Sequence, residues 1–368
     1  MRKLLLPLIV IGLGLAHGRA AHAYPQYQLT KGQTCASCHV SPAGGGLLTG
    51  NGQVVAEDDP TFGGDGSFLS GKWTPPDWLQ LGADARLATG ITDPGHGISP
   101  AFFPMQADLY ARAQHKGLSL NLAGGFRALG DNPAGIFQLH EHYVMWRKDD
   151  DKDGFYVRAG HFRPVIGLRL AEHAEAVRQY VNPLYNESYG LGVGWLSGKA
   201  EVHATAFVHD PIFGSAEDGD GAAFYGELRA GSKAAIGATG KYAKSSDDTR
   251  TLGGLTGKLW LEGAKLLFQG EVDLTHQKFD VGPSRNQLAF DVMTSYFLKP
   301  AWRVDLITGA FQEDLHLAKS DRESVSVNVS WSATAHIEVG FLSRVQTIGF
   351  GDGGQTSSWA LLMGHYRM

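Results

Sequence analysis

The sequence has little of several features that assign most chains to a class. Only two of its 368 residues are cysteine, charged residues make up 19%, and the net charge is −5. No basic stripe is present to neutralise phosphates, which argues against a nucleic-acid partner. After residue 23, no apolar run approaches the roughly 18 residues of a transmembrane helix. If this chain enters a membrane, it does so as strands.

The first 23 residues have the pattern of a secretory signal peptide. Arg2 and Lys3 form a cationic start, residues 4–16 are almost entirely apolar, and Ala21-His22-Ala23 is an A-x-A cleavage signal. A membrane anchor is the alternative, but its apolar run would have to be longer. We therefore expect cleavage before Tyr24 and a mature chain outside the cytoplasm.

Both cysteines stand within four residues, in Cys35-Ala36-Ser37-Cys38-His39. This is the C-x-x-C-H spacing of c-type haem attachment. Two thiols at that spacing face one edge of the ring and add to its two vinyl groups, and the histidine that follows lies under the iron. We predict one covalent haem c per chain, bound by Cys35 and Cys38, with His39 as the proximal iron ligand.

Two other interpretations of the cysteine pair are less consistent with the flanking sequence. A thioredoxin-type disulfide would lie in a βαβ pattern, and none surrounds it. A zinc half-site would need two further ligands, but residues 40–77 contain no cysteine or histidine. Instead Gly44, Gly45 and Gly46 follow, and without side chains they let backbone lie close against a flat macrocycle.

The expected cytochrome segment lacks a distal iron ligand. Residues 24–77 contain no methionine and no histidine other than His39. The sixth position must therefore be filled from elsewhere in the chain or stay open. The candidates are Met105, His140, His142, His161 and His173. Strand parity sends Met105 toward lipid and His161 outward, so we rank His173, which lies in a long loop, first.

From residue 78 onward, apolar and polar residues alternate. In residues 79–88, for example, Leu81 and Leu87 share one face, and Asp84 and Arg86 share the other. Period-2 alternation of this length predicts strands with one apolar and one polar face. The expected strands are 79–88, 103–114, 118–128, 136–147, 155–163, 188–197, 200–209, 223–231, 234–243, 253–261, 264–276, 287–298, 301–312, 323–331, 335–346 and 358–368.

The connections between these strands alternate in length. Tight turns such as Lys116-Gly117 and Ser232-Lys233 are followed by long polar loops such as 89–102 and 164–187. A soluble β-sandwich has no reason to sort its loops this way, whereas outer-membrane barrels do. We predict an all-β, antiparallel transmembrane barrel of about 16 strands, with both termini at the periplasmic end.

Two segments depart from the plain strand pattern. Residues 136–147 place Glu141 on the apolar face with Tyr143 and Met145, which suggests a bulge near Glu141, with His140 and His142 sent to the lumen. The loop 164–187 carries charges of both signs. Either it folds inward, where it would select permeants or hold a haem propionate, or it is a solvated extracellular loop.

The stretch Asp149 to Gly154 resembles half of a Ca²⁺-binding EF-hand loop. The position of the bidentate glutamate is occupied by Gly160, and strands rather than helices flank the stretch. We interpret it as a solvated turn.

With Cys35 to His39, the glycines behind them and the expected barrel, the chain resembles the fused monohaem cytochrome–porins of the bacterial outer membrane. The resemblance implies a signal peptide (1–23), a cytochrome segment (24–56), a Gly/Pro-rich linker (57–77) and a porin-like barrel (78–368). It also implies electron transfer across the Gram-negative outer membrane, between an extracellular redox substrate such as Fe(II) and a periplasmic carrier. The haem segment would enter from the periplasmic side, and the partners would be that carrier, the redox substrate and lipid.

Two other functions compete with electron transfer. One is a haem-bearing porin whose main role is passive solute passage, because barrels of this kind usually conduct something. The other is a haem enzyme such as a peroxidase, although no distal acid–base group is identifiable in the sequence.

Overall fold

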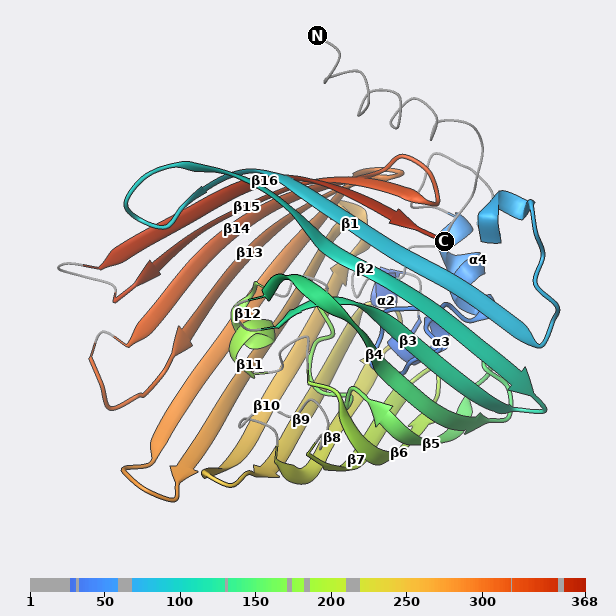
Figure 1. Ribbon diagram of the computed structural model, residues 1–368, viewed down its shortest axis with the longest axis horizontal. Helices are drawn as coiled ribbons and strands as arrows, with labels where there is room; N and C mark the ends of the chain where they lie inside the picture. Colours follow the sequence, from blue (N-terminus) through green and yellow to red (C-terminus); the bar gives the residue numbers. More distant parts are fainter. Residues whose placement is uncertain are drawn as a thin grey trace, which may run out of the picture.

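The wall of the molecule is one closed antiparallel barrel of sixteen strands, in which strands adjacent in sequence pair and β1 closes on β16. A computed structural model describes residues 27–30, 33–58, 68–129, 132–170, 174–181, 186–209, 219–318, 320–349 and 354–368. The predicted all-β class and strand number are confirmed (Figure 1). No helix within these ranges is long and apolar enough to cross a membrane. The expected signal peptide, 1–23, lies outside them, as do residues 59–67 of the expected linker.

The strands run almost the full length of residues 79–367. They are β1 (Leu79–Asp93), β2 (Ser99–His115), β3 (Leu118–Leu129), β4 (Asn132–Arg147), β5 (Gly154–Phe162), β6 (Ser188–Leu196), β7 (Ala200–Val208), β8 (Asp220–Ala230), β9 (Ala234–Lys244), β10 (Asp248–Leu261), β11 (Leu266–Phe279), β12 (Arg285–Lys299), β13 (Trp302–Gln312), β14 (Asp321–Ser332), β15 (Ile337–Ile348) and β16 (Gln355–Arg367).

The alternation in the sequence becomes the two faces of this wall. In β10, Leu255 and Leu259 are exposed on the outer face, whereas Thr256 and Lys258 are buried in the lumen. Because successive side chains of a strand point to opposite sides, each strand contributes to both an apolar outer band and a polar interior.

The two ends of the barrel differ as predicted. We call the end with the tight connections the turn end, and the other the loop end. Some expected loops are shorter than predicted: β1 and β2 continue to Asp93 and Ser99, so the connection expected at 89–102 shrinks to 94–98. Backbone pairing there continues past the point where the apolar alternation ends, because the ladder hydrogen bonds do not depend on it.

A bulge in β2 corrects the expected orientation of Met105. Arg86 of β1 pairs with Gln106 and the next residue, Leu87, pairs with Pro104, so Met105 is the extra residue. A bulge of this kind breaks strict alternation. Met105 is half-buried and lines the lumen cavity together with Gln106, rather than facing lipid as parity had suggested.

The predicted bulge in β4 is confirmed, and it reverses part of the assignment. Ala123 pairs with Glu141 and Gly124 pairs with Leu139, which leaves His140 as the extra residue. Tyr143 and Met145 beyond it are buried inside the barrel, although the sequence had placed them on the lipid face. His140 faces the lumen as predicted, but His142 falls on the outer face with the exposed Val144 and Trp146.

Tryptophans mark the membrane boundary at the turn end. Trp146 and Trp195 lie on the outer face within a few residues of the tight turns, and Trp302 stacks on Trp331 of the neighbouring strand at 5.7 Å between ring centroids. Belts of this kind flank the apolar band of outer-membrane barrels. The turn tips therefore lie beyond the hydrocarbon.

Candidate functional site

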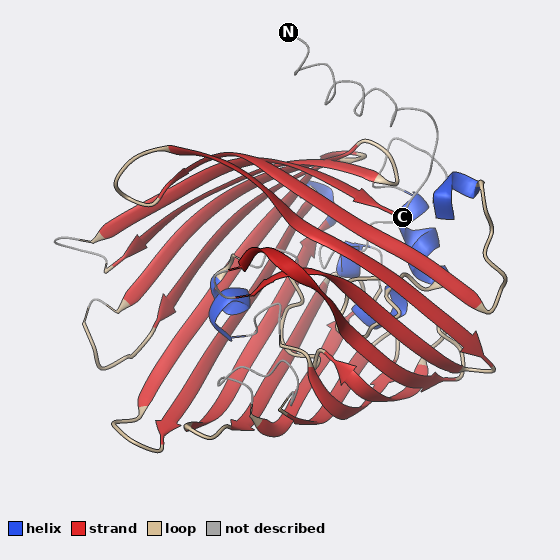
Figure 2. Cartoon of the chain, in the orientation of Figure 1, coloured by secondary structure: helices blue, strands red, loops and turns tan. Residues whose placement is uncertain are grey.

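The predicted haem-attachment motif lies inside the barrel, toward the turn end. The inner segment, residues 27–58, comprises α2 (Tyr27–Thr30), α3 (Cys35–Cys38) and α4 (Gly50–Asp58), and Figure 2 shows short helices enclosed by the strands at that end. Contacts with Arg147 and Asp151, at the β4–β5 turn, fix its level in the lumen.

One helical turn brings both thiols and the histidine together. Thr34 and Ser37 form a capping box: each side-chain oxygen accepts the other's backbone N–H at 2.8 Å. The two orphan donors at the start of α3 are thereby satisfied, and the turn is fixed. Cys35 and Cys38 are both free thiols and only 6% exposed. Burial raises the pKa of the Cys38 thiol to about 12, so it stays protonated at neutral pH.

His39 is held in the tautomer that a metal ligand requires. Its Nδ1 lies 3.0 Å from the carbonyl oxygen of Gly45. A carbonyl can only accept, so Nδ1 carries the proton and Nε2 of the neutral ring carries the lone pair. Gly45 adopts φ +77° with open space around its Cα, as the tight return of the chain requires.

The barrel wall and the loop after β5 bind the inner segment through donors to its backbone carbonyls. Arg147 donates to the Ala36 oxygen at 2.6 Å, Arg169 to the Pro42 oxygen at 3.0 Å, and Gln80 Nε2 to the Leu48 oxygen at 2.6 Å. These bonds satisfy acceptors that have no secondary-structure partner. The apolar contact is small: Ala36 and Val40 pack on a cluster that includes Met145, Tyr156 and Phe162.

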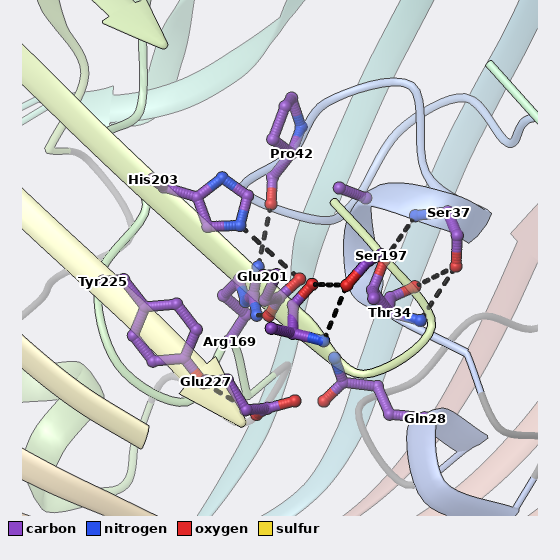
Figure 3. A network of polar contacts seen from close by, with 12 residues as sticks. Gln28, Thr34, Ser37, Pro42, Arg169, Ser197, Glu201, His203, Tyr225 and Glu227 are labelled. Atoms are coloured by element: carbon purple, nitrogen blue, oxygen red, sulfur yellow. Dashed lines mark hydrogen bonds and ion pairs between the residues drawn. The ribbon is translucent and has the colours of Figure 1, made fainter. Parts of the chain in front are cut away.

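Beside this segment lies a buried polar network contributed by β5, β7, β8, β10 and Arg169 of the loop after β5 (Figure 3). Arg169 pairs with Glu201, Glu201 lies 3.5 Å from His203 Nε2, and Tyr156 Oη lies 2.8 Å from His203 Nδ1. A second series of contacts runs through Lys258, which contacts both Gln28 of the inner segment and Glu227. Glu227 also accepts a hydrogen bond from Tyr225 at 2.9 Å. Each buried charge has a partner of opposite sign, which a low-dielectric interior requires.

The loop after β5 folds into the lumen, which decides between the two alternatives left open by the sequence. Wall carboxylates accept its backbone amides: Glu271 from Leu168 at 2.7 Å, and Asp291 from Val177 at 2.7 Å. Glu175 pairs with Arg344 at 2.8 Å on the far wall. A short π-helical turn, η2 (Val177–Val181), lies between these anchors.

A cavity of about 960 Å³ remains between the inner segment, the loop and the β1–β4 wall. Cys35, Cys38 and His39 line it, together with Gly44 to Gly46. Its volume lies at the upper end of the roughly 300–1,000 Å³ range of small-molecule and cofactor sites. The attachment residues therefore meet a space of cofactor size, and the residues present fit a haem.

Of the five candidate distal ligands, the structure brings two to this cavity. Met105 and His140 line it. His142 shares its strand face with the exposed Val144 and Trp146, so the prediction that it is luminal is wrong. His161 stacks on His142 at 5.1 Å and is only 5% exposed, and its outward orientation stays a prediction. His173 lies outside the described residues.

Some residues of the site were not identified from the sequence. The sequence did not identify Arg147, because the bulge at His140 changes which side chains of β4 face the lumen. His365, which also lines the cavity, lies 2.9 Å from Asp84 Oδ1 and 2.9 Å from Arg367 Nη2. Alternation in the last strand places His365 on the lumen face, and this pattern could have identified it from the sequence.

The stretch that resembles an EF-hand loop is not a plain solvated turn. Asp149 pairs with Lys152 at 2.5 Å, Asp150 forms a buried pair with Arg112, and Asp151 Oδ1 accepts the backbone amide of Asn51 at 2.8 Å. These carboxylates are engaged by cations and by the inner segment. In the described part of the chain no group of three or more His, Cys, Asp or Glu is placed to hold a metal ion.

Solved structures of outer-membrane porins share this fold. An anion-selective porin from Comamonas acidovorans covers 79% of this chain and 99% of its own, with 11% identity and a TM-score of 0.61. OmpT of Vibrio cholerae, in a trimer form, covers 79% of this chain and 100% of its own (14% identity, TM-score 0.60). OmpF of Salmonella typhi in complex with daunomycin covers 79% and 97% (10% identity, TM-score 0.58). No protein-family model and no curated protein matches the chain.

Proposed function

We propose that this chain is an outer-membrane electron-transfer protein. A single haem c, attached to Cys35 and Cys38 inside the lumen, would link an extracellular donor or acceptor to a soluble periplasmic carrier. The observation that carries the proposal is the joint placement of both thiols and His39 at one cavity within a closed barrel. The resemblance to cytochrome–porins suggests Fe(II) as the extracellular donor. The short-turn end would face the periplasm, as in other outer-membrane barrels.

The residues of the cavity have complementary roles in holding the group. Each cysteine adds its S–H across one vinyl group, sulfur to one carbon and hydrogen to the other, so no oxidant is consumed. His39 offers Nε2 to the iron, and its bond to Gly45 keeps the ring in that tautomer. Arg86 and Arg112 line the same cavity; Arg86 would supply positive charge to a propionate, whereas Arg112 is already paired with Asp150. When bound, haem c supplies a one-electron Fe(III)/Fe(II) couple.

The wall and the inner segment together favour electron passage over free diffusion. Arg147 and Arg169 tie the segment across the lumen, and the loop 163–187 is anchored to the opposite wall through Glu175 and Asp291. Both elements occupy space that an open porin leaves to water. A redox centre seated among them bridges an otherwise insulating layer.

The distal ligand is the open part of the site. His173 remains the first candidate, because a loop residue is free of strand parity. Met105 and His140 are the alternatives that line the cavity. His140 lies between two carboxylates, with Nε2 3.4 Å from Asp108 and Nδ1 3.9 Å from Glu187.

A second candidate function is passive solute passage. The cavity of about 960 Å³ favours it, since polar side chains such as Asp84, Gln106 and Asp108 contribute to its lining. Under this alternative the haem would have a secondary role, and small sugars would cross the barrel.

Proteoliposomes that enclose ferricyanide and meet Fe(II) from outside test the proposal. We expect the wild type to bleach the ferricyanide, with one Fe(II) oxidised for each ferricyanide reduced. Cys38→Ser should not do so, although it inserts as a folded barrel that migrates faster unboiled than boiled. Equal bleaching by Cys38→Ser would overturn the proposal. Swelling in sucrose by both proteins would favour the channel.

A further inference from the structure

The turn end carries a ring of lysines. Five of its seven connections contain at least one lysine, a sixth follows Lys299 at the end of β12, and all of these lysines are exposed. We call them the lysine rim: Lys116, Lys148, Lys152, Lys199, Lys233, Lys265 and Lys299. At the loop end, by contrast, the connecting segments contain one lysine in the sequence, Lys319, and one strand ends on a lysine, Lys244. In a chain of net charge −5, lysine is thus concentrated at one end.

These lysines make few contacts with the rest of the barrel. Among the described residues, the only rim lysine in an ion pair is Lys152, with Asp149, and Lys299 lies 5.6 Å from the Trp302 ring. Exposed pairs of this kind contribute only about 0–1 kcal/mol. The rim is therefore not explained by the stability of the wall.

Turn chemistry does not explain it either. Lys116 has φ +48° and Lys265 has φ +53°, in the left-handed region that favours glycine and asparagine. Lys116 precedes Gly117, also at positive φ, in a two-residue hairpin where Asn-Gly is the preferred pair. A lysine at these positions costs backbone strain, and within the described residues neither side chain has an ion-pair partner that would offset it. Strain retained without a structural return points to a functional site.

The position of the rim indicates what it meets. Trp146 and Trp195 mark the edge of the apolar band, and Lys148 and Lys199 lie farther along the chain, at the turn tips. The rim also encircles the end of the barrel toward which the inner segment sits, since Asp151, beside Lys152, binds the amide of Asn51. The same connections contain five acidic residues, Asp149, Asp150, Asp151, Asp153 and Glu262, and the four aspartates are engaged by Lys152, Arg112 and the backbone amides of Asn51 and Gly198. A protein that approaches this opening meets lysines around most of its edge, with these carboxylates between them.

We propose that the lysine rim docks the soluble electron carrier of the periplasm through an acidic face that surrounds the carrier's own redox centre. This inference rests on the proposed function and adds the chemistry of the partner. Complementary charge at a rim acts mainly on the rate of association and on its salt dependence. Charged groups around an opening raise such rates by roughly 10- to 1,000-fold at low salt.

The test uses the haem-loaded full-length protein in nanodiscs of neutral phosphatidylcholine. The probes are two soluble c-type cytochromes of similar size and potential, one acidic and one basic. Their binding is measured at low and at physiological salt, and haem-to-haem electron transfer by stopped flow. We expect salt-sensitive binding and fast transfer with the acidic probe only.

Charge-neutralising variants assign the effect to the rim. The variant carries Lys116→Gln, Lys199→Gln, Lys233→Gln, Lys265→Gln and Lys299→Gln. It should bind the acidic probe at least about tenfold more slowly at low salt, without change in reduction by ascorbate. The control, Lys244→Gln with Lys278→Gln at the loop end, should behave as wild type.

Three outcomes would overturn the docking proposal. They are equal binding of both probes, an equal loss in rim and control variants, or a rim effect that appears only with vesicles containing anionic phosphatidylglycerol, which would assign the rim to lipid. Because binding is read directly, this test can fail while the proteoliposome assay succeeds. Failure of that assay alone would refute the electron-transfer function.

Discussion

The barrel wall and the inner segment are held together in different ways. The wall repeats one rule over sixteen strands: each residue pairs with a neighbouring strand, and each second side chain faces outward. The inner segment, residues 27–58, has four- and nine-residue helices, one isolated bridge between His39 and Leu48, and single side-chain bonds to its carbonyls. The wall is redundant, whereas the segment depends on a few individual contacts.

Because of this difference, the wall should tolerate substitutions that the inner segment does not. A wall ladder spreads its free energy over many equivalent bonds, so one substitution changes it little. The inner segment, by contrast, depends on single groups such as the Arg147 guanidinium of β4 or one of its own thiols. We therefore expect substitutions at the segment to change the cofactor and leave the wall intact.

The largest expected effect is that of Cys38→Ser. One of the two thioether bonds cannot form and Cys35 can supply only the other, so we predict a much weaker covalent haem band on denaturing gels stained for peroxidase activity. The barrel should still show heat-modifiable migration, because the thiol takes no part in strand pairing. Ser37→Ala, on the same helical turn, should keep the stain. An undiminished band in Cys38→Ser would refute the assignment of the motif.

A second, graded effect is expected from Arg147→Gln. The guanidinium bond to the Ala36 carbonyl is lost, and a hydrogen bond to a charged group contributes about 1.5–3 kcal/mol. In the haem-free protein, maleimide should then label Cys35 and Cys38 at least about tenfold faster than in wild type. Arg250→Gln, near the loop end, is the control and should label at the wild-type rate. Unchanged labelling in Arg147→Gln would mean that other contacts hold the segment.

A smaller effect is expected from Asp291→Asn. Its two carboxylate oxygens accept the amides of Ala176 and Val177, and an amide side chain offers only one oxygen. One neutral bond contributes about 0.5–1.5 kcal/mol, so limited proteolysis within residues 163–187 should rise a few-fold. Asp280→Asn, exposed at the loop end, should cleave as wild type. Equal cleavage of all three proteins would show that the loop does not depend on this anchor.

The smallest effect is expected at the turn tips, with Asp149→Asn. The hydrogen bond from Lys152, and then the amide of Asp151, lower the pKa of the Asp149 carboxyl. A lowered folded pKa stabilises the protein above the unfolded value, about 3.9, and the contribution is lost as pH falls through the folded pKa. Chemical denaturation at pH 7 should therefore show that Asp149→Asn lowers the free energy of unfolding by a few tenths of a kcal/mol. This difference from wild type should vanish in strong acid. A difference that grows on acidification would contradict this sign.

The sequence predicted the wall because the wall follows a rule that a sequence displays. Alternation from residue 79 onward and sorted connections were sufficient for strand number and closure. Parity failed at Met105, Tyr143 and Met145, because a single extra residue in β2 or β4 reverses the faces beyond it. A bulge leaves a clear trace only where it breaks the pattern visibly, as at Glu141.

The sequence predicted which residues would attach a haem, but not where in the barrel they lie. The spacing of Cys35, Cys38 and His39 identifies haem attachment, since those residues act within one helical turn. That this turn lies in the lumen depends on bonds such as Arg147 to Ala36, which join residues 111 apart in the sequence. No local pattern encodes a contact of that separation. The inward path of the loop 164–187 could not be predicted for the same reason.

The central claim is that the haem-binding segment is lodged inside the closed barrel. It is tested most directly by inserting a protease site between Gly63 and Gly66 of the expected linker and cutting the folded, haem-loaded protein in mild detergent. We predict that the haem absorbance elutes with the barrel in size-exclusion chromatography and separates from it only after boiling. Elution of the haem as a small fragment directly after cleavage, without denaturation, would contradict the account.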